Sequence, residues 1–313
     1  MSKKIRQEFA DQMLKLGSKD KSIVVLVGDI SHGILQPFAK KNQDRYYNIG
    51  ICEQSIVNMA AGLSKVELNP IVHTIAPFIT ERAYEQIKLD FGYQKQNVNL
   101  ITVGGSFDYS KLGCSHHCYT DVSLISHLKN SNIVIPGSSK EFEILFKSIY
   151  KKKKINYFRI PEYSHDVFFS EKKIKFGKSI TVQKGNDITI ATTGTTLKNV
   201  LAASKLLNKI GYKAEIIYFH TIKPFDYSSI KKSVKKTKCL LSVEELSSHD
   251  GIYNQCLKSV VDLNNISTYQ LAVDDFIHNY GTYEELCERV GLGIKNIFKN
   301  AKKQILKKNA KRS

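Results

Sequence analysis

The chain alternates short, continuously apolar runs with longer amphipathic segments, and this alternation constrains its fold more than any other feature. A run of Val, Ile and Leu without polar interruption is typical of a strand that is buried on both faces of a parallel sheet. The amphipathic segments between the runs predict helices, so the pattern indicates an α/β fold. The first series of apolar runs is SIVVLVGD (22–29), PIVHTIA (70–76), VNLITVGG (98–105), NIVIPG (132–137) and INYFRIP (155–161).

A second series of the same kind follows a break in the pattern. Residues 164–184 are polar and irregular, which predicts a linker with one short strand. We therefore predict two doubly wound α/β domains, at 1–165 and 186–313, joined by a linker at 166–185. The apolar runs of the second domain are DITIATTG (187–194), AEIIYFHTI (214–222), CLLSVEEL (239–246) and ISTYQLAV (266–273).

Composition limits the classes of function that the chain can have. The net charge is +18, but the lysines are spread along the chain and form no recognisable nucleic-acid module, so we expect solvated lysine faces and no nucleic-acid partner. No apolar run approaches the ~20 residues that span a bilayer. The first residues lack the apolar core of a signal peptide, and Ile5, Phe9, Met13 and Leu16 fit a helix instead. Six cysteines without a framework spacing favour a reducing cytoplasm.

The stretch KLGCSHHCYTD (111–121) has the side chains of a metal site, because Cys114, His116, His117 and Cys118 lie within five consecutive residues. Neighbouring side chains of an extended or turning chain point apart, so these four rarely converge on one tetrahedral ion. No second Cys/His pair with suitable spacing completes the set. We therefore predict no metal ligands in this chain.

Three segments, NIGICEQSIVNMAAGL, APFITERAYEQIK and LGCSHHCYTD, resemble the pyrimidine-binding domain of the transketolase-like thiamine diphosphate enzymes. Further along, ITIATTGTTLKNVLAA, FHTIKPFD, LLSVEEL and HNYGTYEELCERVGLG match the C-terminal domain of that family in order. The resemblance covers nearly the whole chain. It implies the C-terminal (beta) subunit of a split transketolase, and it extends to the C-terminal half of 1-deoxyxylulose-5-phosphate synthase.

The resemblance implies thiamine diphosphate as the cofactor and a carbanion of that cofactor as the carrier of a two-carbon ketol unit between sugars or sugar phosphates. Glu53, at the start of a predicted helix, would then be catalytic: a carboxyl group hydrogen-bonded to N1′ of the aminopyrimidine favours the form whose 4′ nitrogen takes the C2 proton. Phe78 would stack on the same ring. Arg82 and Gln86, four residues apart on one helical pattern, are further candidates for cofactor binding.

The resemblance also implies a substrate side of the site. His116 aligns with a family histidine that approaches the cofactor and the donor, where it stabilises an alkoxide or moves a proton. Asp121 matches an acidic position, and Arg159 matches an arginine that binds a substrate phosphate. Two departures leave the donor and the acceptor open: His117 replaces the usual Gln, and Leu112 replaces an acid.

The full-length relatives carry a diphosphate-binding domain with Gly-Asp-Gly and a later Asn, and the nearest fragment here, VGDIS (27–31), lacks the second glycine. We therefore expect a partner chain that supplies the diphosphate and Mg²⁺ site, in an α2β2 assembly. Three alternatives stay open: a 1-deoxyxylulose-5-phosphate synthase-like enzyme, the beta subunit of a 2-oxo acid dehydrogenase, and a non-catalytic partner subunit. The SHHCYTD stretch favours the transketolase side, and the combination of Glu53, Phe78 and His116 argues against a non-catalytic role.

Overall fold

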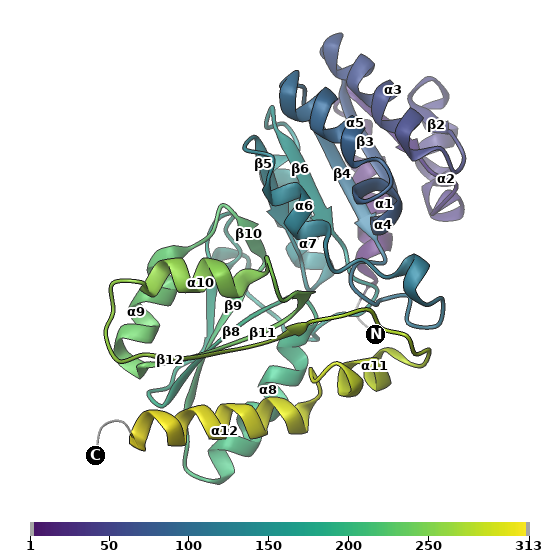
Figure 1. Ribbon diagram of the computed structural model, residues 1–313. Helices are drawn as coiled ribbons and strands as arrows, with labels where there is room; N and C mark the ends of the chain where they lie inside the picture. The colour runs from purple at the N-terminus through teal and green to yellow at the C-terminus, as the bar shows by residue number, and fades with distance from the viewer. Residues whose placement is uncertain (1–2, 311–313) are drawn as a thin grey trace.

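The apolar runs form two separate sheets in the computed structural model of the protein, which describes residues 3–310 (Figure 1). The first sheet has seven strands in the order β10-β5-β6-β4-β3-β1-β2, and every neighbouring pair is parallel except β10 and β5. These strands are β1 (Ile23–Val27), β2 (Tyr46–Asn48), β3 (Asn69–Ile75), β4 (Val98–Val103), β5 (Ser131–Val134), β6 (Ile155–Arg159) and β10 (Thr221–Lys223).

The second sheet has five strands in the order β12-β11-β8-β9-β7, and only β7 runs antiparallel to its neighbour. Two sheets dominated by parallel pairs confirm the predicted α/β class. The apolar runs end within a few residues of the observed strands because each run is buried along its whole length. The strands of this sheet are β7 (Ile180–Gln183), β8 (Ile188–Thr193), β9 (Ala214–Phe219), β11 (Cys239–Ser247) and β12 (Ser267–Val273).

Helices cover both faces of each sheet, which makes two doubly wound layers. In the second half, α9 and α10 lie on one face while α8 and α12 lie on the other (Figure 1). No helix within residues 3–310 is both long and apolar enough to cross a membrane. The α-helices are α1 (Ile5–Gly17), α2 (His32–Lys41), α3 (Glu53–Lys65), α4 (Ala76–Thr80), α5 (Tyr84–Gln86), α6 (Asp121–Ser126), α7 (Ser139–Ile149), α8 (Thr196–Lys209), α9 (Tyr227–Thr237), α10 (Ile252–Val260), α11 (Tyr283–Arg289) and α12 (Ile294–Ala310).

The segment after β3 differs from the single helix that its amphipathic pattern predicts. It forms α4, a turn at residues 81–83, α5 and a π-helical stretch at Ile87–Tyr93. Ala83 has φ −110° and ψ 21°, outside the helical region, and the Arg82 N–H donates to the Pro77 carbonyl at 3.2 Å. The break matters for the site, because it fixes the backbone from which Arg82 projects.

The two halves of the chain are joined by more than a linker. The predicted strand at 214–222 is interrupted at His220, and its last part, β10, pairs with the edge strand β5 of the first sheet. Nearby, the buried Glu141 carboxylate contacts His165 Nε2 at 2.7 Å and accepts a hydrogen bond from the Tyr218 hydroxyl at 2.7 Å. The domain boundaries at 165 and 186 stay a prediction, and β10 lies across them.

Candidate functional site

Three segments that follow the carboxyl ends of neighbouring strands meet at one edge of the first sheet. Helix α3 begins four residues after β2, α4 follows β3 directly, and the segment with His116 follows β4. Parallel strands bring their carboxyl ends to the same edge, where α/β folds place their ligands. This topology explains how residues far apart in the sequence become neighbours.

Glu53 is the first residue of α3, and its carboxylate is almost completely buried, with 1% of the residue exposed. Oε2 accepts a hydrogen bond from Arg82 Nη1 at 2.8 Å. Oε1 accepts a longer one from Thr74 Oγ1 at 3.4 Å. A carboxylate buried at this level needs such partners to offset the loss of hydration.

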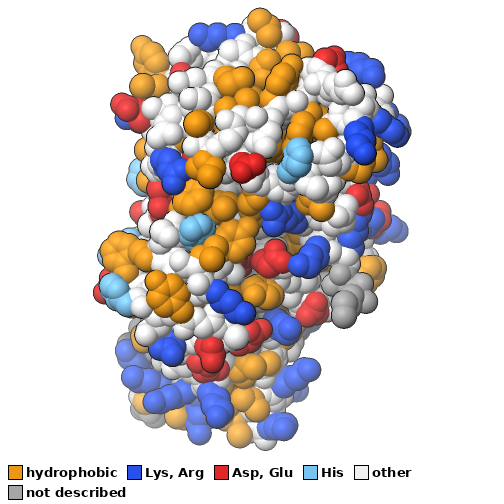
Figure 2. All heavy atoms as spheres, turned by 90° about the vertical axis from the view of Figure 1, so that its right-hand side faces the viewer, with side chains coloured by type: hydrophobic (Ala, Val, Ile, Leu, Met, Phe, Trp, Pro, Cys, Tyr) orange, Lys and Arg blue, Asp and Glu red, His pale blue; other side chains and the backbone are white. Residues whose placement is uncertain are grey.

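Phe78 lies on α4 with its ring half-buried, and two charged or titratable groups contact that ring. Arg82 Cζ lies 4.2 Å from the ring centroid, as in a cation–π contact. The His116 ring lies 5.2 Å away at an interplanar angle of 70°. Glu53, Phe78, Arg82 and His116 therefore form one connected group, called here the Glu53 cluster. Figure 2 shows the face over α2, α3 and α4 on which hydrophobic side chains gather.

Gln86 and His117 do not share these contacts. Gln86 lies half-buried in α5, and no hydrogen bond joins it to the cluster within the described chain. His117 follows His116 directly but is buried, with 4% exposed. Burial lowers the pKa of His117, the Tyr109 carbonyl opposes this shift, and the charge of His116 adds to it. The two adjacent histidines thus differ in environment, and His116 is the more accessible one.

Asp121 and Arg159 lie in the junction between the two sheets. Arg159 Nη1 lies 3.5 Å from Asp121 Oδ1, and Nη2 donates to the Glu245 carbonyl at 3.2 Å. Tyr157 donates its hydroxyl to Asp121 Oδ2 at 2.5 Å. Burial opposes the charged form of Arg159, but the carboxylates of Asp121 and Glu245 raise its pKa. The structure thus gives both predicted substrate ligands partners inside the chain.

Two residues of the site carry no signal that sequence reasoning could use. Thr74 lies inside a predicted buried strand, yet its hydroxyl reaches Glu53. Glu81 Oε1 accepts from Thr120 Oγ1 at 2.5 Å and from Cys118 Sγ at 3.5 Å. Glu81 thereby ties the end of α4 to the segment that carries His116, across a separation of 39 residues that no local pattern reveals.

The two cysteines of the KLGCSHHCYTD stretch lie in different environments. Cys114 is exposed, whereas Cys118 is buried and contacts Thr80 Oγ1 at 3.4 Å. Among residues 3–310, no three or more His, Cys, Asp or Glu side chains come together as a metal site.

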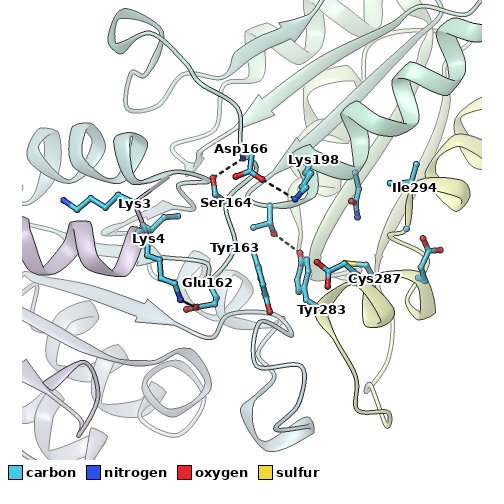
Figure 3. Close-up of a pocket in the computed structure, with 16 residues that line it drawn as sticks. Lys3, Lys4, Glu162, Tyr163, Ser164, Asp166, Lys198, Tyr283, Cys287 and Ile294 are labelled. Atoms are coloured by element: carbon cyan, nitrogen blue, oxygen red, sulfur yellow. Dashed lines mark hydrogen bonds and ion pairs between the residues drawn. The ribbon is translucent and has the colours of Figure 1, made fainter. Parts of the chain in front are cut away.

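A cavity of about 480 Å³ lies at the junction, away from the Glu53 cluster (Figure 3). Lys4 pairs with Glu162 at 2.7 Å, and Lys198 pairs with Asp166 at 3.2 Å, while Tyr283 forms part of the wall. None of the site residues predicted from the sequence lines it. The Glu53 cluster lies instead on an open surface, where 40% of the Arg82 side chain is exposed.

The model "Transketolase, pyrimidine binding domain" matches residues 2–165, and "Transketolase, C-terminal domain" matches residues 177–297. The chain therefore belongs to the transketolase family, whose members are thiamine diphosphate enzymes. It corresponds to the beta chain of a split transketolase-like enzyme, because such chains match it over their whole length, as predicted.

One of two subunits of the apulose-4-phosphate transketolase of Phocaeicola vulgatus is 28% identical, over 95% of this chain and 96% of that protein. The 6-deoxy-6-sulfo-D-fructose transketolase subunit SqwH of a Clostridium species is 25% identical, over 97% and 95%. In contrast, the chain covers only 48% of 1-deoxy-D-xylulose-5-phosphate synthase from Halalkalibacterium halodurans, at 27% identity. A solved structure described as a split gene transketolase, inactive beta4 tetramer, matches with a TM-score of 0.86 and 25% identity, over 98% of this chain and 99% of that one.

Proposed function

We propose that this chain is the beta subunit of a two-chain transketolase that moves a two-carbon ketol unit between sugars or sugar phosphates. The observation that carries the proposal is the Glu53 cluster, in which a buried carboxylate lies beside a half-buried aromatic ring. Thiamine diphosphate, the cofactor of the family, supplies the nucleophilic carbon when it is bound. Everything else that the cluster contributes comes from its own side chains.

The cluster has the groups that an aminopyrimidine ring needs. Glu53 Oε1 has only a long contact with Thr74, so this oxygen retains capacity for a hydrogen bond to a ring nitrogen. Because Glu53 is removed from water, such a bond is stronger than it would be at the surface, and the carboxyl group can hold a proton at that nitrogen. Phe78 offers a flat apolar face for stacking.

His116 is the group we assign to the reacting oxygen of the substrate. Its Nδ1 contacts Ser115 Oγ at 3.0 Å, which orients the imidazole, and it lies beside Phe78. An imidazole in this place can donate to a developing oxyanion or move a proton near neutral pH. Substrate contacts by His117, Asp121 and Arg159 stay predictions, and the partners of Asp121 and Arg159 within the chain favour a positioning role.

We propose further that a partner chain completes the site and supplies the ligands of Mg²⁺ and of the diphosphate, in an α2β2 assembly. The Glu53 cluster lies on an open surface, and exposed apolar side chains occur near it in the sequence: Ile51 is 66% exposed, Met59 44% and Tyr93 82%. Such a surface is typical of an interface. Two relatives are named as subunits, and the beta4 tetramer is described as inactive.

The test is reconstitution. The chain, a partner with Gly-Asp-Gly and a later Asn, and their mixture are each assayed with thiamine diphosphate and Mg²⁺ on a panel of ketose donors, with and without phosphate, and on pyruvate. We expect ketol transfer by the mixture and none by either chain alone. A mixture that decarboxylates pyruvate instead would support the synthase or dehydrogenase alternative. A mixture that assembles and binds the cofactor without any turnover would contradict the catalytic proposal.

A further inference from the structure

The Arg82 side chain makes both contacts that the proposed function assigns to the aminopyrimidine ring. Its Nη1 donates to Glu53 Oε2 at 2.8 Å, and its Cζ lies 4.2 Å from the centroid of the Phe78 ring. A guanidinium group is flat, donates hydrogen bonds and stacks on aromatic faces. It therefore resembles the aminopyrimidine in shape and uses the same two partners.

We propose that Arg82 is an internal occupant of the aminopyrimidine subsite, and that its guanidinium leaves Glu53 and Phe78 when the cofactor ring enters. This inference rests on the proposed function and deepens it. It changes the role predicted for Arg82, from a ligand of the cofactor to a competitor for its place.

The surroundings of Arg82 allow such a movement of the side chain alone. Its side chain is 40% exposed, whereas that of Glu53 is 1% exposed, so only the arginine has a path to solvent. Its backbone is held, because its N–H donates to the Pro77 carbonyl at 3.2 Å and its carbonyl accepts from Gln54 Nε2 at 3.3 Å. Rotation about the side-chain bonds is sufficient to release the subsite.

Occupancy by Arg82 has an effect in each direction. While the guanidinium is in place, the buried Glu53 carboxylate has a charged partner, which stabilises the folded chain. Because the cofactor binds only the form in which the subsite is open, its apparent affinity is reduced by the fraction of molecules in that form. A ring that can both stack on Phe78 and bond to Glu53 displaces the arginine, and a molecule that makes only one of these contacts competes poorly.

The test measures cofactor binding by calorimetric titration of thiamine diphosphate into the assembled two-chain protein at saturating Mg²⁺. We expect Arg82→Ala to bind the cofactor about tenfold more tightly than the wild type. Arg82→Lys, which keeps the charge but not the flat stacking group, is expected to lie between the two. Arg289→Ala, which removes an exposed arginine of α11, is the matched control and should bind as the wild type does.

A second measurement refills the subsite from solution. Methylguanidinium, well below concentrations that unfold proteins, should weaken thiamine diphosphate binding to Arg82→Ala and leave the wild type unaffected. Equal or weaker cofactor binding by Arg82→Ala, with thermal unfolding showing a folded protein, overturns the inference and makes Arg82 a cofactor ligand. If Arg82→Ala does not fold, Arg82→Lys decides by the same comparison with the wild type. Absence of binding by the wild type itself overturns the proposed function instead.

Discussion

The chain contains two arginine–carboxylate pairs that involve predicted site residues, and they differ in almost every physical respect. The Arg82–Glu53 pair is short, 2.8 Å, and its arginine is 40% exposed. The Arg159–Asp121 pair is longer, 3.5 Å, and its side chains are 3% and 0% exposed. The first lies at an open edge of one sheet, whereas the second lies between both sheets.

The difference shows that residue type alone does not tell a site from a strut. Arg159 is surrounded by partners from both halves of the chain, and Gly105 has no side chain at a position where a Cβ would overlap Arg159 Nε. Releasing this arginine would leave charges buried without compensation, which is costly. Arg82 can be released into water, so the first pair suits a place where a ligand enters and the second a place where two domains are held together.

The largest expected effect is on turnover. Glu53→Gln keeps the size of the side chain but cannot share a proton with a ring nitrogen, so kcat of the two-chain enzyme should fall by about 10²–10⁴-fold. Steady-state assays with the partner chain measure this. Glu85→Gln, which changes an exposed glutamate of α5, is the control and should retain wild-type kcat. Full turnover by Glu53→Gln would remove Glu53 from the mechanism.

The next effect is on stability and tests the junction pair directly. Arg159→Leu leaves Asp121 buried without its charged partner, so the free energy of unfolding should fall by about 3–5 kcal/mol. Arg82→Leu, at a pair with an exposed arginine, should cost about 1 kcal/mol. Urea unfolding of the two variants gives both values. Similar losses for the two would erase the distinction drawn between the pairs.

A smaller effect is expected at the substrate side of the cluster. His116→Asn removes the imidazole beside Phe78, and loss of one donor to a developing oxyanion should lower kcat by about 10²-fold with less change in KM. His249→Asn, at an exposed histidine, should leave both constants unchanged. If KM rose while kcat stayed constant, His116 would bind the ground state of the substrate and not act on the reacting oxygen.

The smallest effect concerns the pH dependence of the junction. Burial, followed by the charge of Glu245, raises the pKa of Asp108 well above 3.8. The folded chain therefore holds this proton more tightly than the unfolded chain, so the stabilisation is complete below pH 3.8 and is lost as the pH rises through the higher folded pKa.

Asp108→Asn removes this titration. The unfolding free energy of the variant should fall less between acidic and neutral pH, and at neutral pH the variant should be more stable by about 1 kcal/mol. Urea unfolding across this range measures both quantities. A wild-type profile that rises with pH in the same way as that of the variant would show that Asp108 is ionised in the folded chain.

Much of the fold is predictable from the sequence because buried parallel strands are written as uninterrupted apolar runs, such as the one around β1. The Glu53, Phe78 and His116 positions are accessible through their motifs, and Figure 1 shows why they meet at one sheet edge. The environment of Arg159 is not predictable in this way, since it depends on Glu245, 86 residues away. The turn at 81–83 is equally hidden, because an amphipathic period continues through a helix break.

Strand β10 has a consequence for how the chain is made. During synthesis the strands β1 to β6 emerge first, yet the outer edge of β5 has no hydrogen-bonding partner until residues 221–223 arrive. An unpaired strand edge is a template for association with another chain. A fragment that stops at residue 165 should therefore aggregate, and the nascent first half must wait, with one edge unpaired, for a strand encoded in the second.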